Sequence, residues 1–366
     1  MTMWQTQRTP VDHAQPDDAA ALRLLEDLVA IPSISGDEGA AVSYLVAQMA
    51  ALGFTAHTDA AGNAVGSIGT GRPETVLLGH IDTVPGAIPV RRVDGRLYGR
   101  GTVDAKGPLA AFVIAAARLH AQGRLRGRIV VIGCVEEEAP SSRGAHHVVA
   151  RYRPDLCVVG EPSGWNRVTL GYKGVLRITC RYAGAGAHSA HNQQTAPERI
   201  SALWQRIVAH AAAFNADRER AFDHLLPTLL RINSGGDGLS EWATAEISIR
   251  LPLDVQPQAL AEIIRALDPQ VELRVLGATP AFRAERSTPL VRALTQAIRG
   301  QTAQPGLVLK TGTADMNIVG PAWSCPIVAY GPGDAALDHT PEEHIVLDEY
   351  LSAIRVLETA FARLHE

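Results

Sequence analysis

The chain has 366 residues, which is long for one ordinary hydrophobic core and fits two domains. Hydrophobic residues make up 46% and charged residues 20%, and the formal charge of −4 gives no reason to expect binding to nucleic acid or to an anionic membrane. No apolar run reaches the roughly 18–20 residues of a membrane span, and the first twenty residues lack the apolar stretch of a secretory signal. We therefore expect a cytoplasmic protein.

Apolar, β-branched runs alternate with helical patterns in the first half of the chain. A helix is predicted over Asp37–Leu52, opened by a capping-box arrangement from Ser35 to Glu38. A second helix is predicted over Pro108–Gln122, because proline suits a first helical turn. The buried strands predicted around them are Thr75–Gly79, Ile129–Val135 and Asp155–Gly160. This alternation predicts an α/β fold with a doubly wound, mostly parallel sheet.

The pattern changes near residue 175, where strands become alternately polar and apolar, as half-exposed strands are. The order of elements there is strand, helix, strand, strand, helix, strand, which indicates a smaller α+β domain. The elements placed by residue are Val175–Tyr182, Ala196–Asn215, Trp242–Leu251, Pro257–Leu267 and Val271–Leu276. The larger fold resumes near Thr288, with a strand at Pro326–Tyr330 and a last helix from Leu347. We expect residues 1–175 and 287–366 to form the larger domain and residues 176–286 to be inserted in it.

The predicted strands of the larger domain run into residues that commonly bind metal ions. Those residues are His80, Asp82, the run Glu136-Glu137-Glu138, Glu161 and His339. A further carboxylate, Asp104, lies in a glycine-containing loop just before a helix. In open α/β sheets the binding crevice lies beyond the carboxyl ends of the strands, so these side chains should converge.

Two histidines and several carboxylates form a ligand set suited to zinc, cobalt or manganese. Carboxylates gathered in one crevice would repel one another without a cation, whereas two divalent ions could share one carboxylate as a bridge. Each residue alone has a simpler explanation. His80 or His339 could be an ordinary core or surface histidine, the glutamate run a solvated charge cluster, and Asp104 a turn residue. A single metal site accounts for all of these positions together.

Taken together, these motifs resemble those of the di-zinc peptidase and deacylase family, which includes acetylornithine deacetylase, succinyl-diaminopimelate desuccinylase, aminoacylase and glutamate carboxypeptidase. The resemblance extends from Leu25 to the end of the chain and rests on five separated segments. It implies two divalent ions, zinc or alternatively cobalt. The ligands it implies are His80, Asp104 as the bridging carboxylate, Glu138, Glu161 and His339. It also implies a cis peptide bond between Asp104 and Ala105.

The same resemblance implies roles for residues around the metals. Glu137 matches the general base, and Asp82 matches the carboxylate that orients the His80 imidazole. The family usually has aspartate where this chain has Glu136, a difference of one methylene group that leaves the roles of Glu137 and Glu138 intact. The inserted domain resembles a lid that commonly forms a homodimer, and His188 matches a lid histidine that reaches the reacting carbonyl, often that of the neighbouring subunit. Arg250 matches an arginine that pairs with a substrate carboxylate. Without the family, His188 would be a surface histidine and Arg250 a strand-edge arginine.

Three segments are similar to those of hydrolases that release lysine or ornithine from a small acidic amino-group carrier protein in lysine and arginine biosynthesis. These segments are Gly171–Gly174, Lys310–Asn317 and Tyr330–Asp334. In those enzymes the bond that is cut joins the side chain of the carrier's C-terminal glutamate to the α-amine of the amino acid. Thr311, Gly312 and Thr313 offer donors for a carboxylate, and Asp315 could face a terminal ammonium or cap a helix.

Three other functions stay open from the sequence. The first is a deacetylase of a small N-acetyl amino acid such as acetylornithine, and the second is a metallo-exopeptidase. The third is a non-catalytic binding protein that has kept the fold, although the presence of Glu137 and a complete ligand set argues against it. Activity on a small acetylated substrate compared with a carrier-linked one would separate the carrier hydrolase from the deacetylase.

Overall fold

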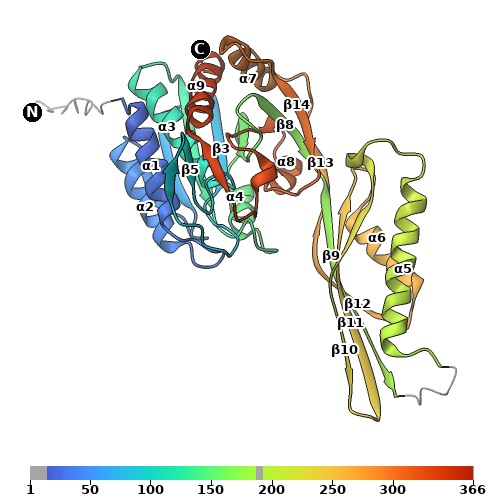
Figure 1. Ribbon diagram of the computed structural model, residues 1–366. Helices are drawn as coiled ribbons and strands as arrows, with labels where there is room; N and C mark the ends of the chain where they lie inside the picture. The colour runs from blue at the N-terminus through green and yellow to red at the C-terminus, as the bar shows by residue number, and fades with distance from the viewer. Residues whose placement is uncertain (1–14, 187–192, 366) are drawn as a thin grey trace, which may run out of the picture.

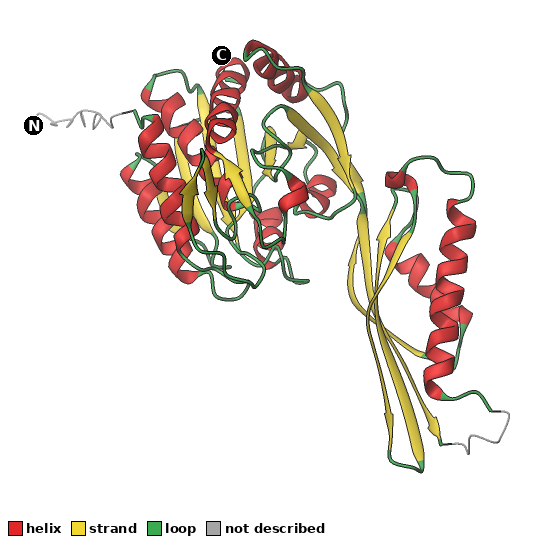
Figure 2. Ribbon diagram, in the orientation of Figure 1, coloured by secondary structure: helices red, strands yellow, loops and turns green. Residues whose placement is uncertain are grey.

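The computed structural model describes residues 15–186 and 193–365, which form two units built around separate sheets (Figure 1). The larger unit contains a nine-stranded sheet and a small three-stranded sheet, and the smaller unit contains a four-stranded sheet. Extended segments join the two units, and the smaller one projects away from the larger (Figure 2). None of the helices in the described ranges is long and apolar enough to cross a membrane.

The large sheet has the strand order β1-β2-β6-β3-β7-β15-β8-β13, and β14 also pairs with β8. Its strands are β1 (Thr55–Thr58), β2 (Ala64–Thr70), β3 (Glu74–His80), β6 (Gly127–Cys134), β7 (Leu156–Gly160), β8 (Arg167–Tyr172), β13 (Phe282–Arg283), β14 (Gly306–Lys310) and β15 (Ile327–Ala329). The central strands β6, β3, β7 and β15 are parallel, as the sequence predicts. The sheet as a whole is mixed rather than mostly parallel, since β1 and β2 pair antiparallel across a short turn and β2 joins β6 antiparallel. A short connection cannot link parallel neighbours.

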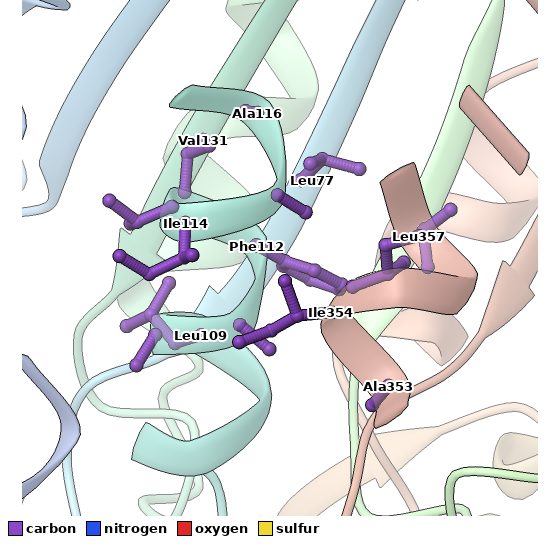
Figure 3. Packing of buried hydrophobic residues seen from close by; sticks show 14 of the residues in the cluster. Leu77, Leu109, Phe112, Ile114, Ala116, Val131, Ala353, Ile354 and Leu357 are labelled. Carbon is purple, nitrogen blue, oxygen red and sulfur yellow. The ribbon is translucent and has the colours of Figure 1, made fainter. Parts of the chain in front are cut away.

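Both faces of the central strands are buried, which explains their continuous apolar sequences. In β6, Val131 packs into the core on one face of the sheet and Val130 into the core on the other. In β3, Leu77 and Leu78 divide between the faces in the same way. Figure 3 shows Leu77 and Val131 near Phe112 of helix α3 (Lys106–Ala121), in the larger of these two cores.

Helices cover both faces of the large sheet (Figure 1). One face carries α1 (Asp18–Ala30), α2 (Gly39–Ala51), α3 (Lys106–Ala121), α7 (Pro289–Gly300) and α9 (Leu347–Leu364), and the other carries α4 (Arg143–Arg151) and α8 (Met316–Ala322). The capping box predicted before α2 is wrong. The Ser35 hydroxyl donates to Asp82 at 2.7 Å, the helix begins only at Gly39, and the residue at its cap position, Glu38, makes no cap hydrogen bond.

The smaller unit is a four-stranded antiparallel sheet covered on one face by two helices (Figure 1). Its elements are β9 (Gly174–Ala185), α5 (Ala196–Asn215), β10 (Leu226–Gly236), β11 (Ser240–Leu251), α6 (Pro257–Leu267) and β12 (Glu272–Thr279), in the predicted order. The helix α5 begins with a capping box, in which the Thr195 side chain and Glu198 satisfy each other's backbone N–H groups. The edge strand β10 is mostly exposed, including 44% of Leu230 and 45% of Ile232.

The chain crosses between the two sheets at Lys173 and again near Pro280. After the second crossing, β13 already pairs with β8 of the large sheet, so the chain rejoins the larger unit by Phe282, slightly before the expected boundary at residue 286. The Asn317 side-chain amide donates to the carbonyl oxygens of Lys173 at 3.2 Å and Pro280 at 2.9 Å. This buried side chain therefore ties both crossings to helix α8.

The three-stranded sheet consists of β4 (Arg91–Val93), β5 (Arg96–Tyr98) and β16 (His344–Val346), in the order β16-β5-β4. It brings the segment after β5 beside the segment before β16. Asp104 follows the first of these strands and His339 precedes the second, so this small sheet places two of the predicted metal ligands close together.

Candidate metal centre

The predicted ligand residues meet beyond one edge of the large sheet. His80 is the last residue of β3, Glu161 directly follows β7, and Glu137 and Glu138 follow β6 by a few residues. Because β3, β6 and β7 are parallel, their carboxyl ends lie at the same edge. The strand ends therefore bring these side chains together, as the sequence predicts.

Asp104 lies between the two histidines and presents one carboxylate oxygen to each. Its Oδ1 lies 3.1 Å from Nε2 of His80, and its Oδ2 lies 3.1 Å from Nε2 of His339. The second histidine also lies 2.8 Å from Oε1 of Glu138. The bond between Asp104 and Ala105 is cis, as expected from the family resemblance. A carboxylate whose two oxygens face different ligand groups has the arrangement needed to bridge two ions.

Among residues 15–186 and 193–365, three groups of side chains have donor atoms within 4.8 Å of one another. The groups are His80 with Asp104 and Glu161, Asp104 with Glu138 and His339, and His80 with Glu137 and Glu138. The first two groups share only Asp104. Imidazole nitrogens and carboxylate oxygens at this separation are the donor set of divalent zinc or cobalt, so the residues present fit a two-metal centre.

The electrostatics of the site show acids and histidines held close together. Burial opposes the charged form of His80, but its hydrogen bonds with Asp104 and Asp82 raise the pKa of the imidazole well above its usual range. Hydrogen bonds with Asp104 and Glu138 raise the pKa of His339 to about 10. Burial would raise the pKa of Asp104, yet the hydrogen bonds from both histidines hold it below its usual range. The close contacts of Asp104 with both histidines thus favour the charged forms of all three groups.

Glu137 and Glu161 show the opposite effect. Burial raises the pKa of both carboxyls well above the usual range, and neighbouring acids raise it further. The cost of burying these like charges is offset when a cation lies among them. A raised pKa is also what a carboxylate needs to act as a proton acceptor and donor near neutral pH.

Asp82 is fully buried and holds the loop that carries the glutamates. Its carboxylate accepts hydrogen bonds from the backbone N–H groups of Glu137 and Glu138, each at 3.0 Å. Asp82 orients the His80 imidazole mainly through its main chain. Nδ1 of His80 lies 3.0 Å from the carbonyl oxygen of Asp82 and 3.6 Å from its carboxylate. Asp82 therefore positions both the histidine and the glutamate run.

Two further buried acids anchor the site, and neither is recognisable as such from the sequence. Glu38 accepts from the backbone N–H groups of Gly36 at 2.8 Å and Glu136 at 3.1 Å, and Glu343 contacts the loop that carries Asp104. The only sequence signal for Glu343 is its place four residues after His339. In the sequence, Glu38 looks like part of a helix start, which conceals its contact with a residue almost one hundred positions away.

The predicted substrate residues are only partly brought together. The Arg250 guanidinium, from strand β11, donates to the Thr313 hydroxyl, so the smaller unit reaches the loop that begins at Thr311. Gly312 lies in the same loop with no atom near the place where a side chain would project. His188 lies outside the described residues.

The structure supports neither role expected for Asp315, the contact with a substrate ammonium or the helix cap. It occupies the cap position of α8, but its side chain makes no cap hydrogen bond. It is only 2% exposed, and neither carboxylate oxygen has a hydrogen-bond partner within the described ranges. Burial raises its pKa to about 7. A carboxyl this deeply buried offers no surface to a substrate in this conformation.

Comparison with known proteins agrees with this site. The family model described as peptidase family M20/M25/M40 matches residues 76–363, most of the chain. The chain belongs to this family. As an M20 member it is a hydrolase of amide bonds, and the match contains every proposed ligand of the metal centre.

Relatives of this M20 chain are similar over nearly their whole length. A LysW-lysine hydrolase of Deinococcus radiodurans is 45% identical over 356 residues, covering 95% of this chain and 98% of its own. A LysW-lysine/LysW-ornithine hydrolase of Saccharolobus islandicus is 29% identical, covering 80% and 82%. Among solved structures, an M20 family metallo-carboxypeptidase of Sulfolobus solfataricus superposes with a TM-score of 0.74 at 19% identity, covering 93% and 98%. At that identity the likeness shows the fold alone.

Proposed function

We propose that this chain is a two-metal hydrolase that releases lysine or ornithine from an amino-group carrier protein. The observation that carries the reaction type is Asp104, with one oxygen toward His80 and the other toward His339. The likeness to the LysW-lysine hydrolase of Deinococcus radiodurans supports the substrate. The bond cut would join the side chain of the carrier's C-terminal glutamate to the α-amine of the released amino acid.

Zinc is the ion we propose, with cobalt as the alternative, because both accept mixed imidazole and carboxylate ligands. His80, Asp104 and Glu161 would hold one ion, and Asp104, Glu138 and His339 the other. When bound, two such ions polarise a carbonyl oxygen and lower the pKa of water.

Proton transfer falls to Glu137. Its carboxylate lies among the ligand groups, and its raised pKa suits a group that takes a proton from water and returns it to the leaving amine. The hydrogen bond from its backbone N–H to Asp82 holds it in place. His188 would donate a hydrogen bond to the oxygen of the reacting carbonyl.

Substrate binding is assigned to the junction of the two units. Arg250 carries a positive charge to the loop at Thr311–Thr313, where the hydroxyls and the open position at Gly312 offer room and donors for a carboxylate. Asp315 is buried and its carboxylate has no hydrogen-bond partner among the described residues, so we do not propose it as a contact for the substrate ammonium. We also propose the unit built on the large sheet as the catalytic domain, and the smaller unit, which the chain enters at Lys173 and leaves near Pro280, as a lid.

Mass spectrometry of a lysine-loaded carrier protein tests the proposed substrate. Incubation with the metal-loaded enzyme is expected to remove the mass of one lysine from the carrier and to release free lysine. Acetyl-lysine and acetylornithine, tested beside it, should be cleaved with a much lower kcat/KM. Efficient cleavage of the acetylated compounds with an intact carrier would instead favour a small-molecule deacetylase.

The lid is proposed to form a homodimer in which His188 serves the neighbouring subunit. The exposed edge strand β10, with Leu230 and Ile232, is a surface that a second copy can cover. Mixing the inactive variants Glu137→Ala and His188→Ala and allowing subunit exchange is then expected to restore activity. Each mixed dimer would contain one intact site, giving at most about half the parent activity. Exchange without recovery would show that His188 acts within its own subunit or not at all.

A further inference from the structure

Glu343 is a fully buried carboxylate that satisfies four donors in one loop. Its Oε1 accepts from the backbone N–H groups of Gly101 at 3.0 Å, Val103 at 2.9 Å and Asp104 at 3.2 Å. Its Oε2 accepts from the Arg100 guanidinium at 2.6 Å. None of the candidate ligand groups includes Glu343, so it stands behind the metal centre rather than in it.

The loop that Glu343 contacts is built of turns and contains no helix or strand. It leaves strand β5 at Tyr98 and reaches helix α3 at Lys106. The backbone at Gly101 has a φ of 88°, and a Cβ there would lie 2.8 Å from Thr83, so the chain turns through a crowded, left-handed position. Buried backbone N–H groups without partners would each cost about 1–3 kcal/mol. Glu343 supplies the acceptor for three of them.

The position of Glu343 in the chain links two ligands. It lies four residues after His339 and directly before strand β16, and its side chain accepts a hydrogen bond from the backbone N–H of Asp104. Its own carbonyl oxygen also accepts from the backbone N–H of Gly99 at 3.3 Å. The segment that contains His339 is thus bonded to the loop that contains Asp104 through the buried carboxylate of Glu343.

We propose that Glu343 is a positioning residue that fixes Asp104 midway between His80 and His339. The inference rests on the proposed metal centre, and it assigns Glu343 no contact with substrate. Ligand geometry must be held within about 0.5 Å for a site of this kind to work. Residues that hold metal ligands in this way typically change metal affinity about 10–100-fold when they are replaced.

Glu343→Gln is the most direct test, because it keeps the size and one acceptor oxygen but turns an N–H₂ group toward Arg100 or the backbone amides. We expect the affinity for the pair of ions, measured by competition with a chelator, to fall about 10–100-fold. In the cobalt-loaded protein, the magnetic coupling between the two ions, measured by electron paramagnetic resonance, should weaken because it depends on the bridging carboxylate. Neither readout requires turnover.

Two control variants separate positioning from general stability. Glu342→Gln changes the exposed neighbouring glutamate and should leave affinity and coupling unchanged. Glu358→Gln disturbs a largely buried pair with Arg118 in the α3–α9 core, so it should lower the melting temperature without changing the metal readouts. If Glu343→Gln folds poorly, Arg100→Gln leaves the three backbone contacts of Glu343 in place, removes its Oε2 partner and a hydrogen bond to the Gly86 carbonyl oxygen, and is expected to give a smaller loss of affinity.

Two results would overturn the proposal. The first is a Glu343→Gln protein with a lower melting temperature but with parent-like metal affinity and coupling, which would make the residue merely structural. The second is a parent protein that binds no pair of ions, which would overturn the proposed metal centre and this inference together. Failure of carrier hydrolysis alone, with two ions bound, would contradict only the proposed substrate.

Discussion

Replacing Glu137 with alanine is expected to lower kcat by about 10²–10⁴-fold or more, the contribution of a general acid–base group, while leaving the metal content near that of the parent. Within the described residues the Glu137 carboxylate makes no hydrogen bond, and only its backbone is held, by Asp82. Glu138 differs, because its carboxylate lies 2.8 Å from His339 and belongs with Asp104 to one ligand group. Glu138→Ala should therefore lower the metal content as well as the activity.

The two roles are separated by measuring bound metal by plasma mass spectrometry beside turnover of the carrier-linked substrate. The geometry makes this necessary, since the Glu137 carboxylate also lies within ligand distance of His80 and Glu138. Glu136→Ala is the matched control, because this first glutamate of the run pairs with Arg143 at 2.9 Å and belongs to none of the ligand groups. Metal lost from Glu137→Ala but retained in Glu138→Ala would show that the assignment is shifted by one residue.

Much of the catalytic unit is predictable because local patterns coincide with the tertiary fold. Strands buried on both faces must be apolar throughout, so β3, β6 and β7 are recognisable, and their ends mark His80 and Glu161. The helices α5 and α6 begin and end at the predicted residues, because proline marks the start of each.

The contacts that support the metal centre could not be predicted in the same way. Ser35 and Glu38 have the spacing of a capping box, but tertiary contacts with Asp82 and Glu136 use their side chains instead. The edge strand β10 lacks a clear apolar alternation because most of it is exposed. Such contacts join segments far apart in the chain, and periodicity carries no information about them.

The burial of Asp315 is a further feature that the sequence does not predict. An acid in a glycine- and threonine-rich segment suggests either a substrate contact or a helix cap, and both readings assume that the side chain reaches donors. The fold instead buries it without a hydrogen-bond partner in the described residues, beside Cys134. Only the packing of α8 against the sheet determines this outcome.

Binding of two divalent ions is expected to release protons near neutral pH, because metal ligands must be deprotonated. Without metal, hydrogen bonds with Asp104 and Glu138 raise the pKa of His339 to about 10, and those with Asp104 and Asp82 raise the pKa of His80 well above its usual range. These shifts favour the protonated imidazoles before an ion binds, and burial likewise favours the protonated carboxyl of the proposed ligand Glu161. Each of these groups must lose its proton before it can bind an ion.

The sign of the pH dependence follows from these raised values. Below the pKa of His339, protons compete with the metal, so the apparent affinity should rise about tenfold per pH unit for each proton released. Titration calorimetry with cobalt in buffers of different ionisation enthalpy measures the number of protons directly. His339→Gln should release about one proton fewer than the parent. An affinity that stays constant between about pH 6 and 8 would show that the histidines are already neutral, and that carboxylates alone balance the charge of the incoming ions.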